Sequence, residues 1–322
     1  MAGVASNYEM GFSSGVMIRG MPLLQTYSGQ VFWVYNGSAV LRNQSGGSDS
    51  GNGTFNRPYA SLDYAVGQCT AGRGDIIVVK SGHSETISSS TALTLDVANV
   101  AIIGLGTGNS RPLFTLDTAN TVTIGVSADN VMISNCRFAA NFLSIAACFT
   151  LTTAKHFTVQ GCYFFDTSSI LNFLNIVKST GAANTVDGLT FNDNVVKNLG
   201  VTSNNTTILT ANDIDRLEMC RNRLKWAVQN DKAIGVIVTA GVLTNAFVTD
   251  NFGYRPNTTT AGGSFINVGG TTSTGWVARN YIQTLTTTSD LLFTTSVGLA
   301  AFENRVTGVV GATGFVIPAV DS

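Results

Sequence analysis

Apolar and polar residues alternate in a short pattern that occurs seven times between residues 131 and 306. The first copy, residues 131–138, reads VMISNCRF, and later copies begin at residues 157, 189, 217, 246, 275 and 299. The first and third positions are mostly apolar and the positions around them mostly polar, which predicts a strand with one buried face. Copies follow one another at 24 to 32 residues, and a period of this length predicts a solenoid.

A second short apolar segment lies midway between copies, at 149–154, 174–179, 207–212, 235–240, 265–270 and 291–296. Two or three strands per repeat predict an all-β parallel β-helix whose neighbouring strands are about 4.8 Å apart. Earlier turns of the same kind are visible at 75–79 and 100–106, so we expect about nine coils.

Two columns of the repeat carry a distinct pattern. The sixth position of the last five copies is asparagine, at Asn194, Asn222, Asn251, Asn280 and Asn304. The fifth position alternates in charge, as Asp193, Arg221, Asp250, Arg279 and Glu303. We expect the asparagines to adopt the left-handed conformation at a corner and to stack, and the charges to form a structural ion-pair ladder.

The N-terminal residues 1–45 do not fit the repeat and are expected to be an arm or cap, with the β-helix domain at 46–322. Their apolar side chains either cover the first coil or contact a partner, and the two roles can coexist. The candidate interface residues in this segment are Leu23, Leu24, Phe32, Trp33 and Tyr35. After a loop at 46–53, Ser61 is a plausible N-cap of a short capping helix within 58–70.

The order GSDSGNGT, RPYASLDYAV and GDIIVVKSGHSET resembles the entry to β-helix proteins of the pectate-lyase-like superfamily. This resemblance implies a single-stranded right-handed parallel β-helix. The stretches LLQTYSGQVFWV and AIIGLGTGNSRPLF extend the likeness to β-helix proteins encoded by tailed bacteriophages. The wider likeness covers most of the chain and implies a virion component, although fold alone does not determine function.

Composition narrows the possible partners. Charged residues are only 11%, the net charge is −1 and no basic run occurs, which argues against nucleic-acid binding. The sequence contains no apolar run of about 18 residues, so it predicts no membrane span. The first residues lack the basic and apolar regions of a signal peptide, so we expect synthesis in a host cytoplasm and a place in the virion. Five cysteines without a CxxC pair indicate reduced, buried thiols.

Candidate chemistry is sparse. A glycoside hydrolase needs two carboxylates about 5 to 9.5 Å apart, and the best cluster is Asp213, Asp215 and Glu218, with Asp250 in a neighbouring turn. The cluster falls at a corner where aspartate is common for turn geometry alone, and we favour that structural interpretation. Two histidines and no aspartate-rich run predict no metal site, and no cofactor motif is present.

Two outward positions on adjacent repeats are aromatic, Phe247 and Trp276. They indicate a lateral partner, a covering loop or a platform for stacking a sugar.

These observations favour a non-enzymatic structural protein: a trimeric bacteriophage capsid decoration (cement) protein or short spike that binds its own copies and other virion proteins such as the major capsid protein. One alternative is a tailspike-like depolymerase of host surface polysaccharide that uses Asp213, Asp215 and Asp250. The other is a glycan-binding module that uses Phe247 and Trp276.

Overall fold

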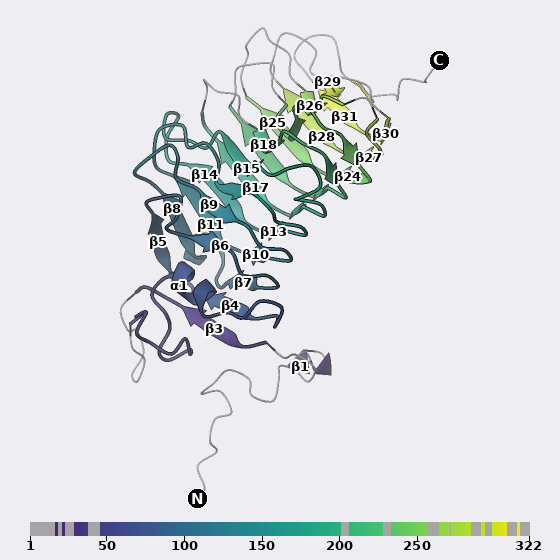
Figure 1. Cartoon of the computed structure of the whole chain (residues 1–322). Coiled ribbons are helices and arrows are strands. Elements are labelled where there is room, and N and C mark those ends of the chain that lie inside the picture. Colours follow the sequence, from purple (N-terminus) through teal and green to yellow (C-terminus); the bar gives the residue numbers. More distant parts are fainter. Residues whose placement is uncertain are drawn as a thin grey trace, which may run out of the picture.

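The chain is described by a computed structural model over residues 17–18, 21–22, 29–37, 46–200, 206–227, 233–256, 264–270, 272–284, 291–293, 298–307 and 314–315. The described residues form a stack of coils, and each complete coil contributes one strand to each of three parallel sheets (Figure 1).

The first sheet contains, in spatial order, β3 (Val31–Val34), β4 (Ile76–Val79), β7 (Ala101–Gly104), β10 (Met132–Ser134), β13 (Thr158–Gln160), β16 (Thr190–Asn192), β20 (Glu218–Cys220), β24 (Ala246–Thr249), β27 (Gly275–Ala278) and β30 (Leu299–Phe302). The second sheet contains β5 (Ser84–Ile87), β8 (Leu113–Leu116), β11 (Arg137–Ala140), β14 (Tyr163–Asp166), β17 (Val195–Asn198), β21 (Arg223–Trp226), β25 (Phe252–Arg255), β28 (Tyr281–Thr284), β31 (Arg305–Thr307) and the antiparallel β32 (Gly314–Phe315). The third sheet contains β6 (Thr94–Leu95), β9 (Ile124–Val126), β12 (Phe149–Leu151), β15 (Asn175–Ser179), β18 (Thr206–Thr210), β22 (Val236–Val238), β26 (Ser264–Val268) and β29 (Leu291–Phe293). Outside these sheets lie β1 (Met17–Ile18) with β2 (Met21–Pro22), β19 (Ile214–Asp215) with β23 (Leu243–Thr244), helix α1 (Leu62–Gly67) and the 3₁₀ turn η1 (Gly108–Ser110).

The predicted all-β, right-handed parallel β-helix is confirmed, and each segment predicted between copies is a strand of the third sheet. The number of coils differs from the nine expected. The expected number counted each copy of the pattern as one coil, but the described residues of the last copy supply only β30 and β31. The described residues contain eight strands of the third sheet and therefore eight complete coils.

The core is filled by equivalent inward positions of successive coils. In the first sheet, Ile133, Val159 and Phe191 are stacked in register and fully buried. In the second sheet, the rings of Phe114, Phe138 and Phe164 form a stack with centroid separations of 5.6 and 5.1 Å. Each coil therefore buries its apolar face mainly against its two neighbours, as in other solenoids.

The corner between the first and second sheets differs in one respect from the prediction. The left-handed residues are those of the fifth column, with φ between 52° and 59° at Asp193, Arg221, Asp250, Arg279 and Glu303. The asparagines that follow them do not adopt this conformation. They point inward and are at most 1% exposed.

Each buried asparagine bonds to the preceding coil in the same way. Asn222 Oδ1 accepts the backbone N–H of Asn194 at 2.9 Å, and its Nδ2 donates to the Phe191 carbonyl at 2.7 Å. Asn251, Asn280 and Asn304 repeat both bonds. The amide stack therefore satisfies backbone groups that the tight corner would otherwise leave buried without a partner.

The N-terminal segment is partly incorporated into the β-helix. β3 pairs in parallel with β4 and extends the first sheet by one strand, within the region predicted as an arm or cap. Helix α1 packs on β3, β4 and β6, and Ser61 is its N-cap, with its hydroxyl accepting from the Tyr64 N–H at 3.4 Å. The prediction of this short helix and its cap is confirmed.

Polar side chains at the start of the β-helix connect its N-terminal segments to one another. Asp49 accepts the backbone N–H groups of Ala60 and Ser61, and Glu85 accepts that of Leu62. Buried His83 receives the N–H of Asn36 on Nδ1, so its Nε2 carries the proton shared with Glu85.

Lys80 donates to the Phe55 carbonyl and lies 3.9 Å from the centroid of that ring. Burial lowers its pKa to about 8. In the part of the chain that the structure describes, no helix is long and apolar enough to cross a membrane.

We predict that Asn222→Ala lowers the unfolding free energy by about 2–4 kcal/mol, because it leaves a buried N–H and a buried carbonyl without partners. The matched control is Arg221→Ala one residue earlier, which removes an exposed ion pair and should cause a much smaller loss. Chemical denaturation followed by circular dichroism measures both. Equal losses in the two variants would contradict a structural role of the asparagine column.

Candidate functional site

The predicted carboxylates at the corner between the third and first sheets connect one coil to the next. Asp213 Oδ1 accepts the backbone N–H of Val242 at 2.8 Å. Asp215 Oδ1 accepts from Thr244 Oγ1 at 3.0 Å and Asn245 Nδ2 at 2.8 Å, and these hydrogen bonds lower the pKa of Asp215. A general acid needs the opposite shift, so this corner has the features of a structural turn.

The other candidate carboxylates are also engaged. Asp250 accepts two bonds from Arg279, at 2.7 and 2.8 Å, and this contact lowers its pKa. Glu218 lies on β20 and accepts from Asn192 Nδ2 at 2.6 Å. The one carboxyl among the described residues with a pKa raised by burial, to about 7, is Asp166. It points inward and accepts the N–H groups of Phe173 and Leu199, so it does not face a surface on which a substrate could lie.

The alternating charged column contains two bidentate pairs. Arg221 Nε and Nη2 donate to Asp193 at 2.7 and 2.9 Å, as Arg279 does to Asp250. Glu303 lies in the next coil and interacts electrostatically with Arg279. All five side chains project outward from the corner, so acidic and basic groups alternate along it from coil to coil.

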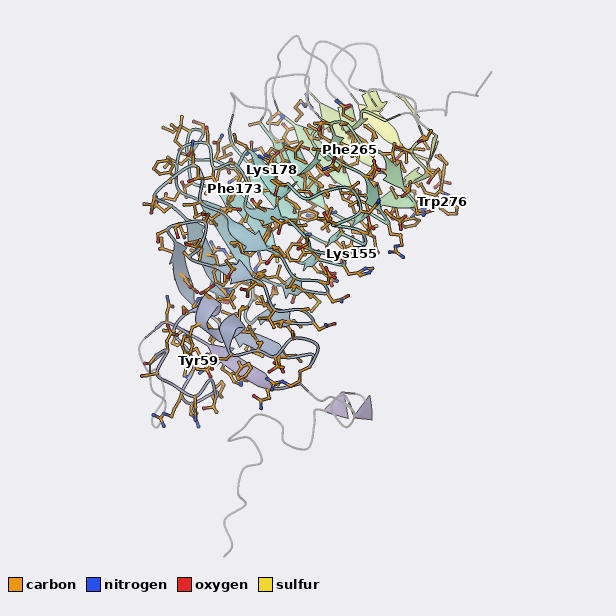
Figure 2. The ribbon with its side chains drawn as sticks, in the orientation of Figure 1. Tyr59, Lys155, Phe173, Lys178, Phe265 and Trp276 are labelled. Carbon is orange, nitrogen blue, oxygen red and sulfur yellow. The ribbon has the colours of Figure 1, made fainter. Side chains whose placement is uncertain are left out.

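The predicted interface residues do not lie together. Phe247 and Trp276 are outward neighbours on β24 and β27, 41% and 55% exposed, with ring centroids 6.1 Å apart. Figure 2 shows Trp276 at the surface of the stack. The ring of half-buried Phe302, on β30, lies 5.9 Å from that of Trp276 and extends this aromatic cluster.

The N-terminal candidates lie elsewhere. Phe32, expected at an interface, is 8% exposed and packs against Tyr59, because alternation along β3 turns it inward. Trp33 contacts Phe55 edge to face at 4.9 Å, and Tyr35 lies beside Lys80. Leu23 and Leu24 lie outside the described residues.

A surface that the sequence prediction missed is the outer face of the second sheet, defined by two rows of outward positions in register. The first row is Leu113, Arg137, Tyr163, Val195, Arg223, Phe252, Tyr281 and Arg305. The second row is Thr115, Ala139, Phe165, Lys197, Lys225, Tyr254 and Gln283. Aromatic and basic side chains are interspersed along both rows, and neither row contains a carboxylate.

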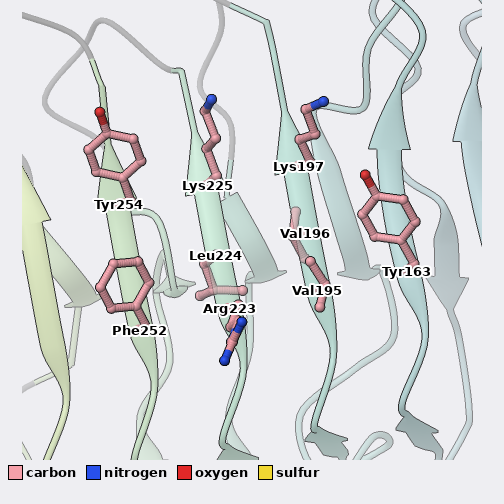
Figure 3. A pocket seen from close by; sticks show the side chains of 9 residues that line it. All are labelled: Tyr163, Val195, Val196, Lys197, Arg223, Leu224, Lys225, Phe252 and Tyr254. Carbon is pink, nitrogen blue, oxygen red and sulfur yellow. The ribbon is translucent and has the colours of Figure 1, made fainter. Parts of the chain in front are cut away.

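This surface contains a groove of about 280 Å³ (Figure 3). Val195 lines the groove and is smaller than the other outward side chain of its row, Arg223, between Tyr163 on one side and Phe252 on the other. Tyr163 and Phe252 are three strands apart, or about 14 Å at the usual spacing. Lys197 and Lys225 lie side by side at one end of the groove (Figure 3).

The sequence does carry a signal for this surface. The seventh position of the eight-residue pattern reads Arg137, Tyr163, Val195, Arg223, Phe252, Tyr281 and Arg305. The column mixes basic, aromatic and aliphatic residues. It therefore lacks the alternating charge that the fifth column shows in the last five copies and the asparagine that the sixth column repeats there. That the basic and aromatic side chains form one surface becomes evident only when they are seen to share one face of the sheet.

The described residues contain no group of three or more His, Cys, Asp or Glu side chains that could hold a metal ion. Burial raises the pKa of the thiols of Cys136, Cys148 and Cys162, which keeps them protonated and unreactive.

Comparison with known proteins finds distant structural likenesses. A rhamnogalacturonan lyase is 11% identical over 90% of each chain, with a TM-score of 0.45. A GH136 lacto-N-biosidase from Eubacterium ramulus is 11% identical over 87% of this chain and 68% of its own, with a TM-score of 0.30. No family model and no curated protein matches the sequence. At these values the likenesses carry no argument about substrate or reaction.

We predict that Asp213→Asn and Asp215→Asn lower the midpoint of thermal unfolding, because each weakens contacts between adjacent coils. Neither should alter the size distribution of any polysaccharide incubated with the protein, measured by size-exclusion chromatography. Shortening of a polysaccharide by the parent chain that either variant abolishes would establish a catalytic role instead.

Proposed function

We propose that this β-helix binds a polysaccharide along the outer face of its second sheet and does not cleave it. The observation that carries the proposal is the in-register series of aromatic and basic side chains around the groove between Tyr163 and Phe252. Aromatic rings present flat apolar surfaces on which the C–H face of a sugar packs, and their hydroxyl groups add polar contacts.

A solenoid presents equivalent outward positions once per coil, about 4.8 Å apart along its axis. The ligand suited to such a surface is itself a repeating chain lying across successive strands. Phe252 is 39% exposed, and Tyr163 and Tyr254 are half-buried. Phe252 stacks on Tyr281 at 5.4 Å, which extends the aromatic surface to β28.

Binding without cleavage agrees with the placement of the carboxylates. Hydrolysis needs two carboxyl groups on one accessible face. The outward rows of the second sheet contain none. The outward row of the third sheet, as far as the structure describes it, reads Thr94, Gly125, Thr150, Lys178, Leu209, Ile237 and Asn267 and also lacks them.

We predict that Tyr254→Ala and Phe252→Ala each weaken binding of a responsive polysaccharide about three- to tenfold, the loss expected for one ring contact. Affinity gel electrophoresis against neutral and acidic polysaccharides measures this. Trp276→Ala, which removes an exposed ring on the first sheet, is the matched control and should bind as the parent does. Weaker binding in Trp276→Ala alone would move the site to the first sheet.

A second candidate is the role expected from the sequence, a trimeric virion decoration or spike that contacts its own copies and the major capsid protein. The exposed rings of Phe247 and Trp276, with half-buried Phe302 beside them, favour it, because exposed aromatic clusters are typical of protein interfaces. This surface is separate from the groove, so both roles are compatible. Mass photometry should then show a trimer for the parent and smaller species for Trp276→Ala, and a monomeric parent would contradict trimer formation.

A further inference from the structure

Five basic side chains project from the outer face of the second sheet. Arg137, Arg223 and Arg305 occupy one row, and Lys197 and Lys225 occupy the other. The chain as a whole carries a net charge of −1, so this concentration of positive charge is local.

Among the residues that the structure describes, no carboxylate forms an ion pair with these five cations. The ion pairs found among the described residues involve Arg73, His83, Arg216, Arg221 and Arg279, and none of the five cations. The carboxylates at the corner that precedes the sheet are occupied, since Asp193 is held by Arg221 and Asp250 by Arg279.

Lys197 and Lys225 are direct register partners on adjacent strands. Like charges placed opposite one another destabilise a sheet. A bound anion between them would remove this repulsion, which makes the pair suited to a negatively charged ligand.

The cations lie beside aromatic rings and not apart from them. Arg137 is 5.3 Å from the Phe165 centroid and Lys225 is 5.9 Å from that of Tyr254. Cation–π contact holds each charged group next to a ring. Arg137 also donates from Nη1 to the Asn109 carbonyl at 2.9 Å and its Nε is buried, so Lys225 is the better placed of the two cations for a ligand. A sugar that stacks on such a ring would place a carboxylate or sulfate substituent within reach of the cation.

Nucleic acid could also bind to a surface of cations and aromatic rings, but proteins that bind nucleic acid usually carry an overall positive charge. The isoelectric point of this chain is about 6.1. We therefore propose that the ligand of the second-sheet face is an acidic polysaccharide, with Lys197, Arg223 and Lys225 pairing with its anionic groups. This inference rests on the proposed function and specifies its substrate class.

The test uses the full-length chain, with heparin as the acidic probe and desulfated, N-acetylated, carboxyl-reduced heparin as the neutral probe of the same backbone. Binding is measured by isothermal titration calorimetry at several salt concentrations. We expect at least tenfold tighter binding of the acidic form, weakening steeply with salt. Lys197→Ala/Lys225→Ala and Arg223→Ala should each lose at least fivefold affinity for heparin and none for the neutral form.

The matched control is Lys155→Ala/Lys178→Ala, which removes the same charge from the corner after the third sheet and from β15 of that sheet (Figure 2). It should bind heparin as the parent does, whereas an equal loss in this control would show a diffuse charge effect and overturn the proposal. Equal affinity for the acidic and neutral forms would also overturn it and leave the proposed function standing. Binding of neither form would reject both, and tighter binding of single-stranded DNA than of heparin would replace the polysaccharide by a nucleic acid.

Discussion

Parallel, in-register pairing of each coil with the next is the constraint on which the rest of this structure depends. Because equivalent residues lie about one strand spacing apart, every column of the sequence repeat becomes a line of side chains along the molecule. An inward column must fill the core, and an outward column forms a continuous stripe of surface. The hydrogen-bonded asparagine column helps to maintain this register, since each side chain satisfies backbone groups of the preceding coil.

The same constraint explains how a chain with few charged residues can present a strongly basic surface. Five cations are a modest number in the sequence, but stacking places Lys197 beside Lys225 and aligns Arg137, Arg223 and Arg305 in one row. Acidic residues such as Asp193, Asp213 and Asp250 are located at corners, where they hold turns and pair with arginines. Composition and net charge average over these columns and therefore hide the surface.

The fold followed from the sequence because apolar residues two apart and a regular period are direct consequences of its geometry. The ion-pair column was also visible, since alternating charge in one column requires only correct alignment. The backbone conformation of the corner was not visible in the sequence. Asparagine is the usual left-handed residue, but here its side chain is needed inside as a hydrogen-bonding group, so the residue before it, whether Asp193 or Arg221, takes the positive φ. The inward orientation of Phe32 was not predictable for a related reason: its strand had no visible repeat partner, so the direction of its side chain could not be read from a column.

Chemical footprinting of lysines tests the central claim, that the outer face of the second sheet is the binding surface, most directly. Lys197 and Lys155 are both exposed, and Lys225 and Lys178 are both partly buried, so each groove lysine has a matched counterpart on another face. Acetylation rates measured by mass spectrometry with and without heparin should fall at Lys197 and Lys225 and stay unchanged at Lys155 and Lys178. Protection of Lys178 or Lys155 with none at Lys197 and Lys225 would contradict the account.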